Sequence, residues 1–188
     1  MGRFEVRIGG FGGQGVITLG YLLGEAASIH DGRYVVMTQS YGPEARGGSC
    51  RSDIVISDEA IDYPKITRPD CLVAMNPDAY YSYKDEVRPG GVIIYDGELF
   101  KVPSSQRVKS IRYHNIHAQR VASELKNPIA GNIVMLGALV SITGCSAVES
   151  VKKAVAERFP RFVEANTAAL EAGIRLGEGG RCRPKAGG

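Results

Sequence analysis

The chain has 188 residues and a formal net charge of +3, from 23 basic and 20 acidic side chains. Hydrophobic residues make up 44% of it and charged residues 23%, so it can bury a core of its own and is not a disordered protein. The small, mixed charge argues against a nucleic-acid-binding protein, and no apolar run approaches the roughly 18 residues of a membrane span. Without a signal peptide pattern, we expect a cytoplasmic protein with no membrane partner.

The cysteines are far apart in the sequence, at Cys50, Cys71, Cys145 and Cys182. Iron–sulfur and structural zinc sites usually draw their ligands from close pairs such as C-x-x-C. A self-contained cluster or metal site is therefore not expected. We expect the first three cysteines to be reduced residues of the core.

The first forty residues have the pattern strand, glycine turn, helix, strand. An apolar-alternating strand at 4–8 leads into the glycines of 9–15, and a helical pattern runs from 16 to 27. A second strand at 34–37 is apolar throughout, which is typical of burial on both faces. This order predicts a βαβ unit with parallel strands, followed by a loop at 39–48.

The rest of the chain continues to alternate. We expect strands at 49–57, 70–75, 92–95 and 108–113, and helices at 78–87, 117–125, 127–142, 147–159 and 161–176. Asn76 or Asp78 is a candidate cap of the first of these helices, and Ser146 of the fourth. The prediction is one α/β domain at 1–177, a Rossmann-like three-layer sandwich with a mainly parallel sheet, and a flexible, Gly-rich basic tail at 178–188.

The first glycine loop contains G-x-G-x-x-G between a strand and a helix. Its candidate phosphate- or coenzyme A-binding residues are Gly10, Gly12, Gly13, Gln14 and Gly15. Glycines here permit a tight turn and a close approach of backbone amides to an anion at the helix N-terminus. The alternative is that they only let strand and helix pack tightly. No G-K-[ST] follows, which excludes P-loop NTPase chemistry.

Ordinary nicotinamide dinucleotide binding requires an acid at the end of the second strand, for the ribose hydroxyls. That strand ends in Met37-Thr38-Gln39, whereas Asp31 and Arg33 precede it. The sequence therefore disfavours a stand-alone NAD(P)-dependent oxidoreductase, which remains the alternative from another functional class.

The second glycine loop reads T-Q-S-Y-G-P-E-A-R-G-G over residues 38–48. Together the two loops resemble the γ subunit of 2-oxoacid:ferredoxin oxidoreductases. The resemblance continues through 51–57, 61–65 and 127–132 and covers residues 3 to 176. The residue sequence of the second loop is most similar to that of the 2-oxoglutarate branch of the family. The related indolepyruvate enzymes share the first loop.

The resemblance implies a complex that oxidatively decarboxylates a 2-oxoacid, transfers the acyl group to coenzyme A and reduces ferredoxin. Thiamine diphosphate, Mg2+ and iron–sulfur clusters do this chemistry on other subunits. The implied partners are the α, β and, where present, ferredoxin-like δ subunits, with ferredoxin reached through the complex. We expect this chain alone to bind none of these cofactors and to be inactive.

The resemblance implies that the second glycine loop binds coenzyme A or contacts another subunit. The candidate residues are Ser40, Tyr41, Gly42, Glu44 and Arg46. Arg46 can bind a phosphate or carboxylate bidentately, or pair with Glu44 inside the loop. Tyr41 either faces a partner or packs within the loop. We predict no catalytic residue and no metal ligand.

Two further features remain open. The cluster Tyr80, Tyr81 and Tyr83 lacks the interleaved basic residues of a nucleic-acid-stacking surface, so helix packing or a subunit interface is favoured. Asn132 belongs to the resemblance, and the sequence does not reveal its role.

Overall fold

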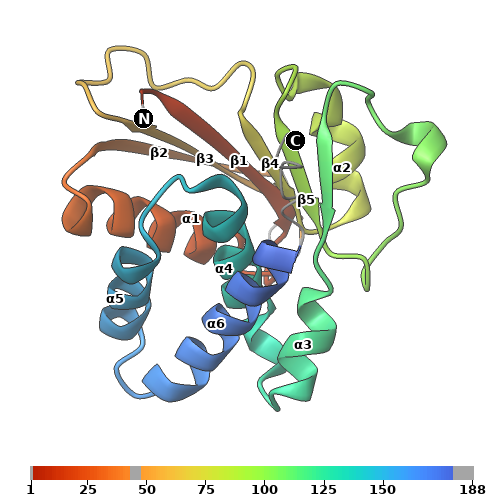
Figure 1. Ribbon diagram of the computed structural model, residues 1–188. Helices are drawn as coiled ribbons and strands as arrows, with labels where there is room; N and C mark the ends of the chain where they lie inside the picture. The colour runs from red at the N-terminus through yellow and green to blue at the C-terminus, as the bar shows by residue number, and fades with distance from the viewer. Residues whose placement is uncertain (1, 43–47, 180–188) are drawn as a thin grey trace, which may run out of the picture.

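The computed structural model describes residues 2–42 and 48–179, and Figure 1 shows helices on both faces of a central sheet. The strands are β1 (Phe4–Phe11), β2 (Tyr34–Tyr41), β3 (Ser49–Ser57), β4 (Cys71–Ala74), β5 (Val92–Tyr95) and β6 (Arg112–Asn115). The helices are α1 (Val16–Glu25), η1 (Ala26–His30), α2 (Pro77–Tyr83), η2 (Lys84–Glu86), η3 (Ser104–Gln106), α3 (Ala118–Glu124), η4 (Pro128–Ala130), α4 (Gly131–Thr143), α5 (Val148–Arg158) and α6 (Val163–Gly179). The predicted three-layer α/β sandwich is confirmed.

The sheet is mixed and has the order β2-β3-β1-β4-β5-β6. β1, β4, β5 and β6 are parallel, and β3 is antiparallel to both β1 and β2. The mainly parallel sheet is therefore confirmed. However, β1 and β2 are not neighbours, because the hairpin after β2 returns β3 into the space between them. The simple βαβ unit predicted from the pattern is wrong in this respect.

β2 also differs from its prediction. It continues to Tyr41, so residues expected in a loop are in a strand, and it lies at the edge of the sheet rather than buried on both faces. Val35 and Met37 pack against the core under α1, which accounts for the apolar character of the strand. As an edge strand, β2 has a neighbouring strand on one side only. At the other edge, β6 begins at Arg112 because residues 108–111 form a turn, in which Ile111 N–H donates to the Val108 carbonyl (3.1 Å).

One face of the sheet carries the larger core, under α1, α4, α5 and α6. α4 and α6 approach so closely that a Cβ added at Gly137 would overlap the Leu170 carbonyl, and one added at Gly173 would overlap the Val134 carbonyl. Only glycine permits this contact between the two helix backbones. α4 ends at Thr143, and its C-cap Gly144 closes the helix with a φ of 63°.

The opposite face is covered by α2. Asn76 caps this helix as predicted, with its Oδ1 accepting the Ala79 N–H (2.7 Å). Tyr80 is fully buried, packs against Tyr113 and Phe100, and donates its hydroxyl to the Gln106 carbonyl (3.0 Å). Helix packing is thus the role of Tyr80, and stacking on a nucleic acid is excluded for it.

Two helix ends differ from the sequence prediction. α5 begins after Ala147, and its cap comes from a distant residue: Asp31 Oδ2 accepts the Ala147 N–H (3.1 Å) and the Ser146 hydroxyl (2.6 Å). Ser146 therefore orients the capping carboxylate and is not the cap. α6 extends to Gly179, two residues into the predicted tail, and residues 180–188 lie outside the described part. None of the described helices is long and apolar enough to cross a membrane.

Candidate functional site

The candidate site lies at the carboxyl edge of the sheet, where the parallel strands β1, β4 and β5 all end. The first glycine loop follows β1 there, Met75 and Asn76 follow β4, and Asp96 follows β5. Open α/β sheets bind their ligands at this edge. The structure therefore brings the first predicted loop to the expected position.

The first glycine loop is held by Gln14 from the inside. The Gln14 Oε1 accepts the Phe11 N–H (2.7 Å), and its Nε2 donates to the Met75 carbonyl (2.9 Å). Gly13 and Gly15 have φ values of 93° and 77°, which other residues rarely adopt. Gln14 thus braces β1 against β4.

Gly10 lies in β1, because this strand runs three residues beyond its predicted end. A Cβ at Gly10 would come within 2.8 Å of Gln14 Oε1, Met75 Cβ and Val16 Cγ2. Close packing therefore requires glycine at this position.

Asn132 has a clear place in the site. Its side chain lies against Gly15, where an added Cβ would overlap its amide, and its Oδ1 accepts the Ile133 N–H (3.0 Å). The N-termini of α1 and α4 therefore lie side by side at the end of the first glycine loop. The sequence showed that Asn132 belongs to the resemblance, but its contact with Gly15 depends on folding.

The two glycine loops meet. Gly12 N–H donates to the Gly48 carbonyl (2.9 Å), and Gly42 N–H donates to the Ser49 carbonyl (2.7 Å) to close the β2–β3 hairpin. Ser40 and Tyr41 lie at the exposed end of β2, and the Tyr41 hydroxyl donates to Gln39 Oε1 (2.9 Å). Glu44 and Arg46 lie outside the described residues.

A cavity of about 240 Å³ opens beside the first glycine loop, lined by Gly13, Gln14, Asp96, Gln119 and Asn132 among others. Asp96 is almost fully buried, and its two carboxylate oxygens accept the N–H groups of Glu98 (2.9 Å) and Gln119 (2.8 Å). Burial raises the pKa of Asp96 despite these hydrogen bonds. The carboxylate organises the loop after β5.

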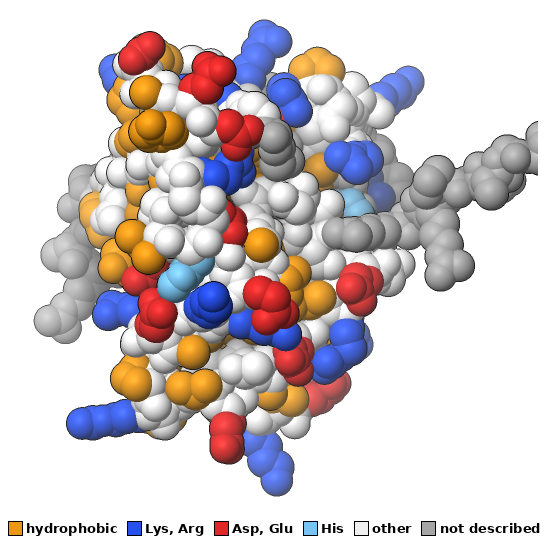
Figure 2. All heavy atoms as spheres, turned by 60° about the vertical axis from the view of Figure 1, so that its left-hand side comes forward, with side chains coloured by type: hydrophobic (Ala, Val, Ile, Leu, Met, Phe, Trp, Pro, Cys, Tyr) orange, Lys and Arg blue, Asp and Glu red, His pale blue; other side chains and the backbone are white. Residues whose placement is uncertain are grey.

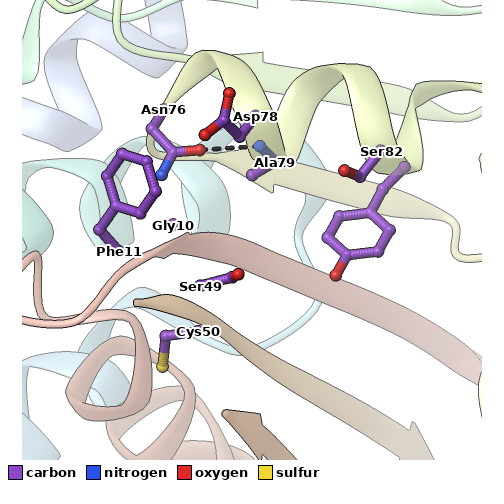
Figure 3. A pocket seen from close by; sticks show the side chains of 9 residues that line it. Gly10, Phe11, Ser49, Cys50, Asn76, Asp78, Ala79 and Ser82 are labelled. Atoms are coloured by element: carbon purple, nitrogen blue, oxygen red, sulfur yellow. Dashed lines mark hydrogen bonds between the residues drawn. The ribbon is translucent and has the colours of Figure 1, made fainter. Parts of the chain in front are cut away.

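A smaller cavity of about 90 Å³ lies on the α2 side of the same edge and is shown in Figure 3. Asn76 is 3% exposed, and its Nδ2 is buried without a hydrogen-bond partner in the described structure. The view shows this nitrogen on the side of Gly10 and Phe11, opposite the oxygen that caps α2. Asn76 thus offers an unused donor at the cavity, which the sequence did not single out beyond its capping role.

A third cavity, of about 140 Å³, lies between the end of β2 and α2 and is lined by Ser40, Tyr41, Arg51 and Tyr83 among others. The Arg51 guanidinium lies over the Tyr83 ring (5.6 Å) and its Nε is 3.4 Å from Asp53 Oδ2. Arg51 is a basic residue at the site that the sequence analysis did not select. Its place at the site follows from the pairing of β3 with β2, which sets Arg51 opposite Ser40.

Within the described ranges, no three His, Cys, Asp or Glu side chains form a group that could hold a metal ion. Cys50, Cys71 and Cys145 are buried and free, as expected. Burial raises the pKa of all three thiols, that of Cys145 to about 11. Burial therefore disfavours the thiolate form of all three side chains.

The topology also bears on dinucleotide binding. In a Rossmann site the acid that binds the ribose stands on the strand next to β1. Here β3 occupies that place and β2 is one strand further away, about 10 Å from β1 at the usual strand spacing. Gln39 and its exposed neighbours therefore cannot replace the missing acid.

The chain is similar to known proteins over most of its length. Residues 5–176 match the family model "Pyruvate ferredoxin/flavodoxin oxidoreductase". The 2-oxoglutarate synthase subunit KorC of Methanocaldococcus jannaschii is 47% identical over 86% of this chain and 87% of its own, and that of Methanothermobacter thermautotrophicus is 45% identical over 93% and 95%. A keto/oxoacid ferredoxin oxidoreductase γ subunit from Geobacter sulfurreducens superposes with a TM-score of 0.85 at 37% identity, over 96% and 99% of the two chains. The chain therefore belongs to the pyruvate ferredoxin/flavodoxin oxidoreductase family.

Proposed function

We propose that the chain is the γ subunit of a 2-oxoglutarate:ferredoxin oxidoreductase. The complex would oxidatively decarboxylate 2-oxoglutarate, transfer the acyl group to coenzyme A and reduce ferredoxin. The similarity to two KorC subunits at 45–47% identity, over 86–93% of this chain, supports this branch of the family. The chain contributes binding and assembly rather than the redox chemistry.

Within the complex, the two glycine loops bind the phosphates of coenzyme A. The contact of Gly12 with Gly48 carries this proposal, because it holds both loops beside the N-terminus of α1. The N-cap of α1 is Gly15, and no side chain among the described residues caps the helix, so N–H groups of its first turn are available to an anion. Ser40, Tyr41, Gly42, Glu44 and Arg46 supply further contacts to coenzyme A or to a neighbouring subunit.

Thiamine diphosphate, Mg2+ and the iron–sulfur clusters belong to the α, β and δ subunits, and ferredoxin docks on that part of the complex. The cysteines of this chain are far apart in the sequence and form no close pair of the C-x-x-C type, which supports this division. The free cysteines Cys50, Cys71 and Cys145 support a reducing compartment, and we infer that the protein is cytoplasmic.

The first test is purification of the tagged chain from its own host and identification of its partners. We expect co-purified subunits that contain thiamine diphosphate and iron–sulfur clusters, and 2-oxoglutarate-dependent ferredoxin reduction that requires coenzyme A. A chain recovered alone with a bound nicotinamide dinucleotide would contradict the proposal. Preference of the complex for indolepyruvate would move it to the related branch.

Coenzyme A binding is tested separately in the assembled complex. Arg46→Ala should raise the KM for coenzyme A about tenfold or more through the lost charge-assisted hydrogen bonds, and should leave the KM for 2-oxoglutarate unchanged. Arg161→Ala, at an exposed arginine before α6, is the matched control. An unchanged KM for coenzyme A in Arg46→Ala would assign the second glycine loop to subunit contact instead.

A further inference from the structure

The outer edge of β2 is unusually open to pairing. Its sequence, Tyr34-Val35-Val36-Met37-Thr38-Gln39-Ser40-Tyr41, contains no charged residue and no proline. In the described structure its backbone hydrogen-bonds only with β3, so the groups directed outwards are free. Natural edge strands are usually shortened, charged or interrupted by proline to prevent such pairing. The opposite edge follows that rule, because β6 is only four residues long and contains Arg112 and His114.

An apolar cavity accompanies this edge. It measures about 320 Å³ and lies between α1 with η1 and the α1-facing side of β2, where Val35 and Met37 line it. Tyr21 and Ile29 border it and are 49% and 70% exposed. Figure 2 brings this side of the molecule forward and shows hydrophobic side chains among charges of both signs. A further strand beside β2 would direct alternate side chains into this cavity and cover both residues.

The cavity also contains an unused hydrogen-bond acceptor. Glu25 lines it, and its Oε2 is buried without a hydrogen-bond partner among the described residues. A buried carboxylate oxygen without a donor is costly. The occupant of the edge is therefore expected to bring an N–H or O–H group to this point.

We propose that the occupant is a second copy of this chain, paired antiparallel through its own β2 about a twofold axis. With the axis at Met37, Val35 of one copy lies opposite Gln39 of the other, on the α1-facing side. The Gln39 Oε1 already accepts the Tyr41 hydroxyl, so its Nε2 is free to donate to Glu25 of the first copy. Both copies satisfy their buried acceptor in the same way.

The chemistry of the strand favours self-pairing. A twofold axis brings identical residues near one another, and like charges on the strand would oppose it. β2 has none, and its Met37 would meet Met37 of the second copy while Ile29 and Tyr21 of both copies cover the joint. The two sheets become one continuous sheet of twelve strands, twice the six of one chain.

Sedimentation of the full chain at several concentrations tests the proposal. We expect a dimer at about 100 µM, within the range of micromolar self-association. Ile29→Lys should raise the dissociation constant more than about tenfold, since it replaces a buried apolar contact with a charge in both copies. Ile129→Lys is the matched control at another isoleucine, 89% exposed and far from β2 in the sequence, and should leave the dimer intact.

The register is tested by exchanging the two polar residues. Gln39→Glu places a carboxylate beside Glu25 and should weaken the dimer about tenfold, whereas Glu25→Gln in addition restores a donor and should recover it. A monomer at the highest concentration overturns the proposal. The proposal is also overturned if Ile29→Lys leaves the sedimentation of the isolated chain unchanged but abolishes its co-purification with other subunits. Another chain would then cover the edge of β2.

Discussion

On the face covered by α1, α4, α5 and α6, the strands direct aliphatic side chains such as Ile8, Ile54 and Val73 into one continuous core. On the α2 face the same strands direct charges inward. Arg7 and Asp53 are 3% and 5% exposed and form a bidentate pair, with Nε–Oδ1 at 2.8 Å and Nη2–Oδ2 at 2.9 Å. Arg7 also contacts Glu86 and lies over the Tyr83 ring (5.1 Å).

The stability of the two faces depends to different degrees on the exact identity of the packed side chains. An aliphatic core tolerates small shifts, because dispersion contacts are non-directional. A buried ion pair requires both members, since a single buried charge is strongly destabilising. The cavities beside Asn76 and Arg51 lie on this second face, so the charged network also fixes one wall of the candidate site.

The largest expected effect is loss of the buried ion pair. Arg7→Ala leaves Asp53 buried without a countercharge and should lower the free energy of unfolding by about 3–5 kcal/mol. Urea denaturation measures it. Arg3→Ala removes the neighbouring exposed pair with Glu5 and should cost at most about 1 kcal/mol. Similar losses in both variants would show that the α2 face does not depend on its charges.

The aliphatic face is tested where its helices touch. Gly173→Ala forces a Cβ into the Val134 carbonyl and should cost about 1–3 kcal/mol, because the two backbones must separate. Gly179→Ala is made in the same helix, where an added Cβ meets nothing within 4 Å, and should be neutral or slightly stabilising. Thermal unfolding of both variants decides whether α4 and α6 are packed as described.

A smaller effect is expected at the cap of α2. Asn76→Ala removes the acceptor of the Ala79 N–H and should lower the free energy of unfolding by about 1 kcal/mol. Asn76→Asp keeps the acceptor and should keep most of the stability, while it removes the free Nδ2 donor. If Asn76→Asp nevertheless raises the KM for coenzyme A in the complex, the donor takes part in binding. An equal loss of stability in both variants would contradict the capping role.

The smallest effect at neutral pH concerns Cys145, whose pKa is raised by burial to about 11 from an ordinary 9.0. The folded state therefore holds the thiol proton more tightly than the unfolded state. The contribution of this tighter proton binding to the free energy of unfolding is fully present below pH 9.0. It is lost as the pH rises towards about 11. Between these values the free energy of unfolding should fall more steeply in the native chain than in Cys145→Ala. Parallel curves would show that this thiol does not titrate on unfolding.

The sequence by itself determined most of the elements. Apolar runs predicted strands at β4 and β5, and a cap at Asn76 or Asp78 predicted the start of α2. The first glycine loop was predicted between β1 and α1, because local turn chemistry requires glycine at positive φ. These features depend on residues close together in the chain.

Only the tertiary structure decided which strands are neighbours. The periodicity of β2 is the same for a central and an edge strand, so the insertion of β3 between β1 and β2 could not be predicted from it. The same holds for the cap that Asp31 provides to α5, for Asn132 against Gly15, and for the contact of Gly12 with Gly48. Each joins residues distant in sequence, and local patterns carry no information on such pairs until the chain has folded.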